Sequence, residues 1–75
     1  MNLDYMKSQL EKAKADRENQ IRAIKMEARS IIGADELSSD KVADRLDKLN
    51  RMNHKLIHLE SKITALDFSL KSLNL

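Results

Sequence analysis

Residues 49–73 read LNRMNHKLIHLESKITALDFSLKSL, and their apolar side chains recur in alternating steps of three and four. This spacing places the apolar residues on one side of an α-helix, as in the seam of a coiled coil. Towards residue 40 the pattern weakens, because Val42 keeps the register but Arg45 takes an apolar position, with Leu46 beside it. The stretch predicts one long amphipathic helix. Its seam consists of Leu49, Met52, Leu56, Leu59, Ile63, Leu66, Leu70 and Leu73.

The first part of the chain has the same spacing, with one interruption. From Ala13 through Arg17 to Ile21 the steps are four and four, a stutter that would locally unwind a supercoil. We expect Arg17 to lie along the seam, with its aliphatic stem packed and its charged head in water. The apolar series is Leu3, Met6, Leu10, Ala13, Ile21, Ile24, Ala28 and Ile31.

The segment IIGADELSS at residues 31–39 separates the two helical patterns. Gly33 suits the left-handed residue that often closes a helix, and Ser38, Ser39 or Asp40 could cap the next one. A connection this short makes neighbouring helices antiparallel. The sequence predicts an all-α fold, an antiparallel two-helix hairpin forming a coiled coil. We place a single domain at 1–75, with a helix at 3–32, the turn at 33–39 and a helix at 40–73.

Charged residues that flank the seam favour the antiparallel orientation. In an antiparallel pair the flanking heptad positions face each other g to g and e to e. Folding the chain near residue 37 then brings residues of opposite charge to face each other. A parallel self-pairing of the second helix would also oppose Lys55 to Glu60 and Lys62 to Asp67, but it would leave the apolar face of the first helix uncovered. The expected ion pairs of the hairpin are Glu27 with Lys48, Asp16 with Lys62, Lys14 with Glu60, and Lys7 with Asp67.

The composition argues against several functions. The 75 residues include no Cys and no Pro, 3% are aromatic and the net charge is +2. With no apolar run approaching the roughly 20 residues of a membrane span and no leader segment, we expect a soluble, cytoplasmic protein. His54 and His58 lie one helical turn apart, but no third ligand is nearby in the sequence. We therefore expect no metal, no cofactor, no small-molecule substrate and no enzymatic activity.

Apolar residues outside the seam form a second stripe on the second helix, which predicts a protein contact. A lone hairpin also leaves its seam half covered, so a second copy or a partner's helix would complete the burial. We expect a homodimer, a four-helix bundle or a complex with another protein, in which the chain acts as an adaptor, inhibitor or chaperone. The predicted partner-binding residues are Ile57, Ser61, Thr64 and Phe68 on the second helix, with Met26 and Ile32 on the first.

A basic ridge on the second helix supports an alternative function, binding of RNA or DNA by a dimer. Its side chains are spaced three and four residues apart, so that they could lie across phosphates. A third hypothesis is a purely structural assembly segment with no heterologous partner. The basic ridge consists of Lys48, Arg51, Lys55, His58 and Lys62.

Overall fold

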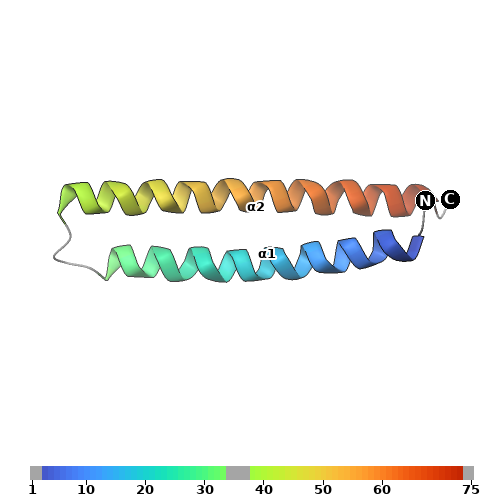
Figure 1. The fold of residues 1–75 in the computed structure, drawn as a ribbon, viewed down its shortest axis with the longest axis horizontal. Helices are drawn as coiled ribbons and strands as arrows, with labels where there is room; N and C mark the ends of the chain where they lie inside the picture. Colours follow the sequence, from blue (N-terminus) through green and yellow to red (C-terminus); the bar gives the residue numbers. More distant parts are fainter. Residues whose placement is uncertain (1–2, 34–37, 74–75) are drawn as a thin grey trace.

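The computed structural model describes residues 3–33 and 38–73, which form two long antiparallel helices (Figure 1). Helix α1 spans Leu3–Ile32 and helix α2 spans Ser39–Leu73. The molecule measures 56 × 15 × 14 Å, whereas an unbroken helix of this chain would be about 110 Å long. The predicted all-α hairpin is confirmed.

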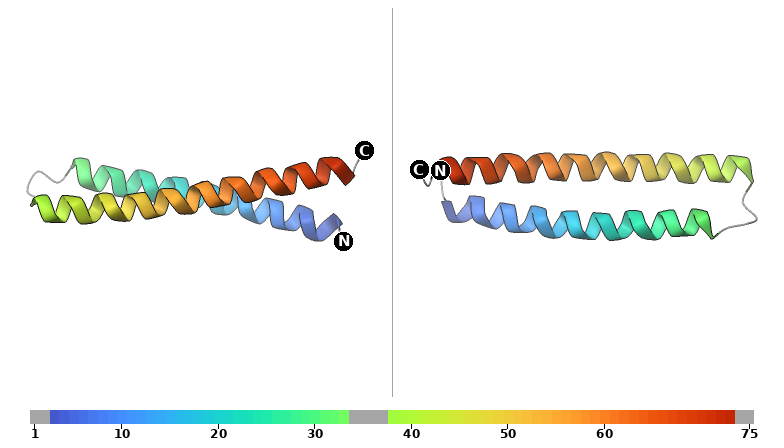
Figure 2. Two further views of the ribbon diagram at one scale, coloured as in Figure 1. Left: turned by 90° about the horizontal axis from the view of Figure 1, so that it is seen from above. Right: turned by 180° about the vertical axis from the view of Figure 1, so that it is seen from behind.

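The two helices run alongside each other and cross at a shallow angle (Figure 2). The beginning of α1 and the end of α2 therefore lie at one end of the rod, and the turn lies at the other. Among the described residues, no helix is apolar over a length that could traverse a lipid bilayer.

The buried core lies at the end of the rod that is away from the turn. Leu3 and Leu66 are partly buried and pack against it. The predicted seam of α2 faces α1 from Val42 to Leu70, but Leu73 is 58% exposed. No described residue of α1 extends beyond Leu3 to cover it. The buried residues are Met6, Leu10, Ala13, Ile63 and Leu70.

Ser38 caps the beginning of α2. Its carbonyl oxygen accepts the first helical hydrogen bond from Val42 N at 3.0 Å, and its hydroxyl accepts one from Lys41 N at 3.4 Å. Both bonds satisfy amide groups that a helix start leaves free. The helix therefore begins at Ser39, one residue before the predicted position.

Gly33 does not close α1 in the predicted way. Its φ is not positive, and its N–H donates to Arg29 O at 2.9 Å, which continues the helical bonding pattern. The prediction of a left-handed residue here is wrong, because the chain is still right-handed at this point. A Cβ at Gly33 would lie 3.2 Å from the same carbonyl oxygen. The rest of the predicted turn, up to residue 37, lies outside the described residues.

The inward side of α1 continues in steps of three and four through polar residues. Arg17, Gln20 and Glu27 are half-buried in register with the apolar residues before and after them. Arg17 and Ile21 are both half-buried, as expected for the seam, and the half-buried Gln20 beside them adds a further polar side chain. An apolar pattern cannot reveal such positions, because it counts only residues that avoid water.

Candidate functional site

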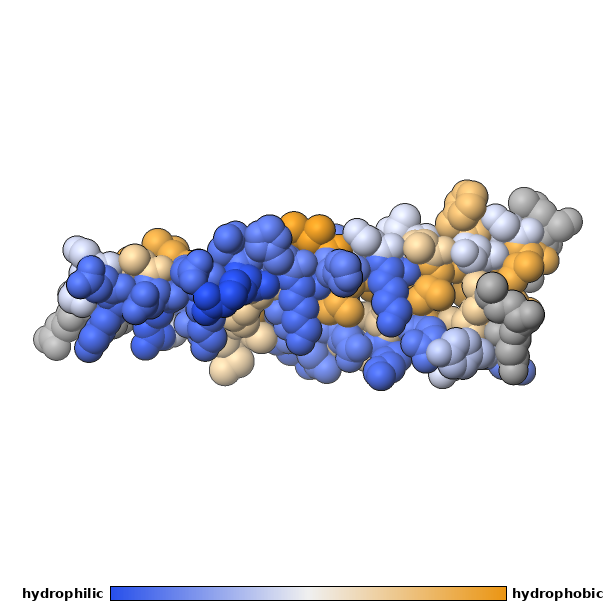
Figure 3. Space-filling model, turned by 45° about the horizontal axis from the view of Figure 1, so that its top comes forward, coloured by the Kyte–Doolittle hydropathy of each residue, from blue (hydrophilic) through white to orange (hydrophobic). Residues whose placement is uncertain are grey.

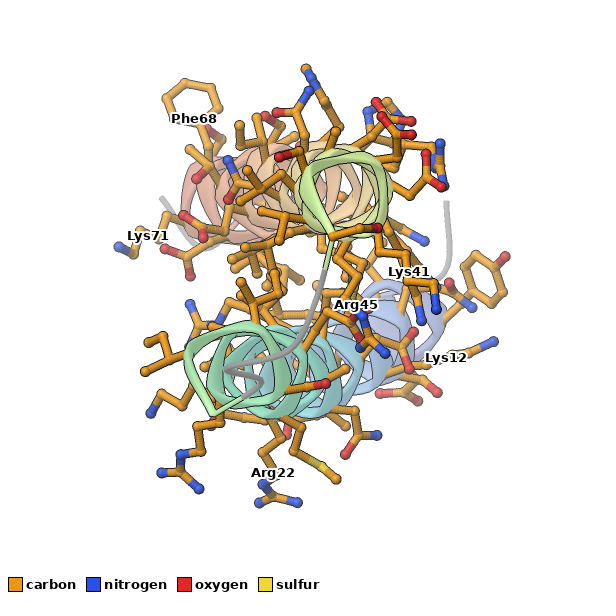
Figure 4. All side chains as sticks on the ribbon, turned by 90° about the vertical axis from the view of Figure 1, so that its left-hand side faces the viewer. Lys12, Arg22, Lys41, Arg45, Phe68 and Lys71 are labelled. Carbon is orange, nitrogen blue, oxygen red and sulfur yellow. The ribbon has the colours of Figure 1, made fainter. Side chains whose placement is uncertain are left out.

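An outer groove lies on the side of α2 that faces away from α1. It encloses about 570 Å³, and Figure 4 shows Phe68 projecting outward at its margin. Residues three and four apart on a helix share one face, which is why this segment of α2 forms a continuous wall. The groove is lined by Ile57, Glu60, Ser61, Thr64, Ala65 and Phe68.

The outer groove exposes apolar surface to water. Ile57 is 54% exposed and Phe68 is 72% exposed, and the small side chains of Ser61 and Ala65 lie between them. Thr64 Oγ1 donates to Glu60 O at 3.0 Å, so its hydroxyl already has a hydrogen-bond partner within the helix. The arrangement is suited to receiving an apolar side chain of another molecule.

Two smaller hollows flank the outer groove along the rod. One, of about 380 Å³, joins the two helices near the turn, where Ile24 meets Leu46 and Asn50. The other, of about 330 Å³, lies beside Phe68 and Leu73 at the opposite end. Figure 3 shows hydrophobic residues gathering towards that end, whereas hydrophilic residues cover most of the remaining visible surface.

The structure brings together four of the six predicted partner-binding residues. Ile57, Ser61, Thr64 and Phe68 all line the outer groove. The other two, Met26 and Ile32, are on α1, where they are 69% and 81% exposed and do not line it.

The basic ridge is exposed along its whole length, and part of it is already paired. Lys48 Nζ lies 3.4 Å from Glu27 Oε2, and Arg51 Nη1 lies 2.6 Å from Asp47 Oδ2. In residues 3–33 and 38–73, the other three side chains of the ridge have no ion pair within 4.0 Å. Lys41, one heptad before Lys48, lies on the opposite side of the rod from Phe68 (Figure 4). The basic ridge and the outer groove share no residue, and the periodicity of 3.6 residues per turn places them on different sides of α2.

A polar cluster holds the two helices together near the turn. Glu27 has only 14% of its side chain exposed, and its carboxylate lies 3.7 Å from Arg45 and 3.4 Å from Lys48. Arg45 Nη1 also donates to Ser30 Oγ at 2.7 Å. About two helical turns further from the turn, Gln20 Nε2 donates to Met52 O at 2.9 Å. These contacts join the two helices directly.

The charge pattern predicted only part of this network. The Glu27–Lys48 pair is confirmed, but Asp67 pairs with Lys71 of its own helix at 3.0 Å instead of with Lys7. The other two expected ion pairs, Asp16 with Lys62 and Lys14 with Glu60, do not form between the described residues. A cation four residues away on the same helix is close to the carboxylate whatever the other helix does. At exposed positions this ion pair therefore forms in place of the one between the helices. The sequence showed Arg45 only as a charged residue at an apolar position, without predicting its partners, and the hydrogen bond of Gln20 was not predicted either.

The described residues contain no group of three or more His, Cys, Asp or Glu side chains arranged to hold a metal ion. His54 and His58 are both exposed on α2. The outer groove is shallow and open, with exposed apolar side chains flanking it. Comparisons with known protein families, curated proteins and solved structures found no match to this chain.

Proposed function

We propose that the chain is a non-enzymatic protein-binding module, a small coiled-coil adaptor, inhibitor or chaperone whose contact surface is the outer groove of α2. The observation that carries this proposal is the pair of large apolar side chains, Ile57 and Phe68, which stay more than half exposed on either side of one groove. Burying a large apolar side chain contributes about 1.5–3 kcal/mol. Covering both would supply a substantial part of a binding free energy.

An amphipathic helix is the partner segment that this groove suits best. Its floor contains the small residues Ser61 and Ala65, so a second helix can approach closely and insert a side chain between Ile57 and Phe68. Glu60 at the rim is the one charged residue in the lining and can select a basic or amide group on the partner. Binding of an apolar helix face in such a groove is a common recognition mode.

Nucleic-acid binding is the second candidate. It is favoured by Lys55, His58 and Lys62 of the basic ridge, which are exposed and have no ion pair among the described residues. No aromatic side chain interleaves with the ridge to stack on bases. Binding that depends on Lys55 and Lys62, and that weakens steeply with salt, would favour this candidate.

The test compares two double variants that remove similar apolar surface at different places. Ile57→Asp with Phe68→Asp changes the outer groove, whereas Tyr5→Asp with Met26→Asp changes exposed residues of α1. Each protein is used to capture partners from the native cell, the captured proteins are identified by mass spectrometry, and helicity is measured by circular dichroism. We expect specific partners to be lost only with the groove variant.

An identical set of captured proteins with both variants and the unchanged chain would contradict the proposal. The control matters because Met26 is exposed to a similar degree but lies outside the groove. If partners are lost only with the α1 variant, the contact surface lies on α1 and not in the outer groove.

A further inference from the structure

One face of α2 carries three large apolar residues at regular intervals, of which Leu46 also lines the hollow shared with Ile24 of α1. Leu46, Ile57 and Phe68 are eleven residues apart and are 51%, 54% and 72% exposed. Eleven residues are about three helical turns, so these side chains lie along one line with a spacing of about 16.5 Å. Ile57 is at the centre of the line, with Leu46 and Phe68 at equal distances from it.

In steps of three and four between these three, the residues that continue the same face carry no charge. In a chain of which 35% is charged, the whole face from Leu46 to Phe68 is apolar or neutral. Its order is the same from either end: large, polar, polar, large, polar, polar, large. We call this face the charge-free strip. It consists of Leu46, Asn50, Asn53, Ile57, Ser61, Thr64 and Phe68.

We propose that the charge-free strip binds the same strip of a second copy of this chain, with the two α2 helices antiparallel about a two-fold axis at Ile57. This inference rests on the proposed function, because it names the occupant of the outer groove. A two-fold contact uses one surface twice, so that residue i faces j and j faces i. The palindromic order meets this condition. The facing pairs are Ile57 with Ile57, Leu46 with Phe68, Asn50 with Thr64, and Asn53 with Ser61.

Charges near the strip are compatible with the antiparallel arrangement, although none of the facing pairs joins opposite formal charges. Glu60, the charged residue of the groove lining, comes opposite His54 of the second copy. Asp47 and Asp67 also come opposite each other, but they are neutralised within their own helix, by Arg51 at 2.6 Å and by Lys71 at 3.0 Å. The basic ridge stays exposed at the side of the bundle.

The size of the strip determines how strong this association is. It is about 33 Å long and one helix diameter, about 10 Å, wide, which gives roughly 330 Å² of projected contact on each copy. Stable interfaces bury about 800 Å² of accessible surface per partner. The dimer is therefore weak and concentration-dependent, and a better-fitting helix of another protein can displace the second copy.

Cysteine crosslinking tests the arrangement, because the chain contains no Cys of its own. Facing Cα atoms of two packed helices come within disulfide range. We expect Ile57→Cys to form disulfide dimers roughly tenfold faster than Met26→Cys, an exposed position of α1. With a short bifunctional thiol reagent, Leu46→Cys and Phe68→Cys should crosslink when mixed but not alone.

The outcomes separate this inference from the proposed function. Crosslinking of Leu46→Cys with itself and Phe68→Cys with itself would indicate a parallel pair and overturn the arrangement, as would an Ile57→Cys rate equal to that of Met26→Cys. If Ile57→Cys stays monomeric while captured partners still depend on Ile57 and Phe68, self-association is excluded and the proposed function survives. If neither the crosslinking rate nor the capture of partners depends on Ile57 and Phe68, both the dimer and the proposed function are contradicted.

Discussion

The end of the hairpin away from the turn is held together differently from the end beside the turn. In the terminal half, residues 3–16 and 60–73, the buried side chains are all apolar and include every buried residue that the described chain contains. In the turn half, residues 17–33 and 38–59, seam residues are at most half-buried, and Gln20 and Glu27 join the helices through polar contacts.

This difference separates stability from register. Apolar layers contribute most of the free energy of folding, but neighbouring apolar layers are interchangeable, so one helix could slide along the other. A half-buried carboxylate with two cations opposite has one good position, because a shift of one turn would leave all three charges without partners. We infer that the terminal half stabilises the hairpin and that the turn half sets its alignment.

The largest effect should come from emptying the terminal half. Leu10 is 7% exposed, so Leu10→Ala should lower the free energy of unfolding by about 2–3 kcal/mol, through lost burial and a residual cavity. Leu49→Ala, at a half-buried position of the turn half, should have about half that effect. Urea denaturation followed by circular dichroism measures both. An equal or larger effect at Leu49 would break the comparison between the halves.

A smaller effect should follow from neutralising the polar cluster. Glu27→Gln keeps the shape of the side chain but leaves Arg45 and Lys48 close together without the carboxylate, and we expect a loss of about 1 kcal/mol in unfolding free energy. The matched control is Asp47→Asn, which breaks the exposed pair with Arg51 and should cost only about 0.3–0.5 kcal/mol.

Salt sharpens this test, because exposed ion pairs are screened. In about 1 M salt the effects of both substitutions should shrink, and that of Asp47→Asn should vanish first. If Asp47→Asn costs as much as Glu27→Gln, the polar cluster has no special role in the turn half.

The smallest effect should be a gain in stability. Arg17 Nε is buried and has no hydrogen-bond partner among the described residues, and its guanidinium pairs only with the exposed Glu18. Arg17→Leu should therefore raise the unfolding free energy by about 0.5–1 kcal/mol, since it removes an unsatisfied donor and extends the apolar seam. Arg22→Leu, on the outer side of α1 (Figure 4), is the control and should not stabilise. A loss of stability in Arg17→Leu would show that its charge is needed where it lies.

Much of the fold and part of the candidate site could be predicted because they depend on periodicity. The steps of three and four from Leu49 to Leu70 predict which side of α2 faces α1, and the structure agrees. The same geometry places Ile57 and Phe68 together on the outer side. The partners of long charged side chains were less predictable, because Asp67 can reach a cation on its own helix as easily as one on the other.

The amino-acid sequence by itself determined two amphipathic helices, a break between them and the side of each helix that avoids water, since these follow from short-range spacing. Only the tertiary structure decided that polar residues complete the seam of α1, that Ser38 is the cap of α2, and that Arg45 shares Glu27 with Lys48. The physical reason is that a polar side chain can satisfy its hydrogen bonds in water or in a partner with similar free energy. Its choice depends on which groups the opposite helix brings within reach.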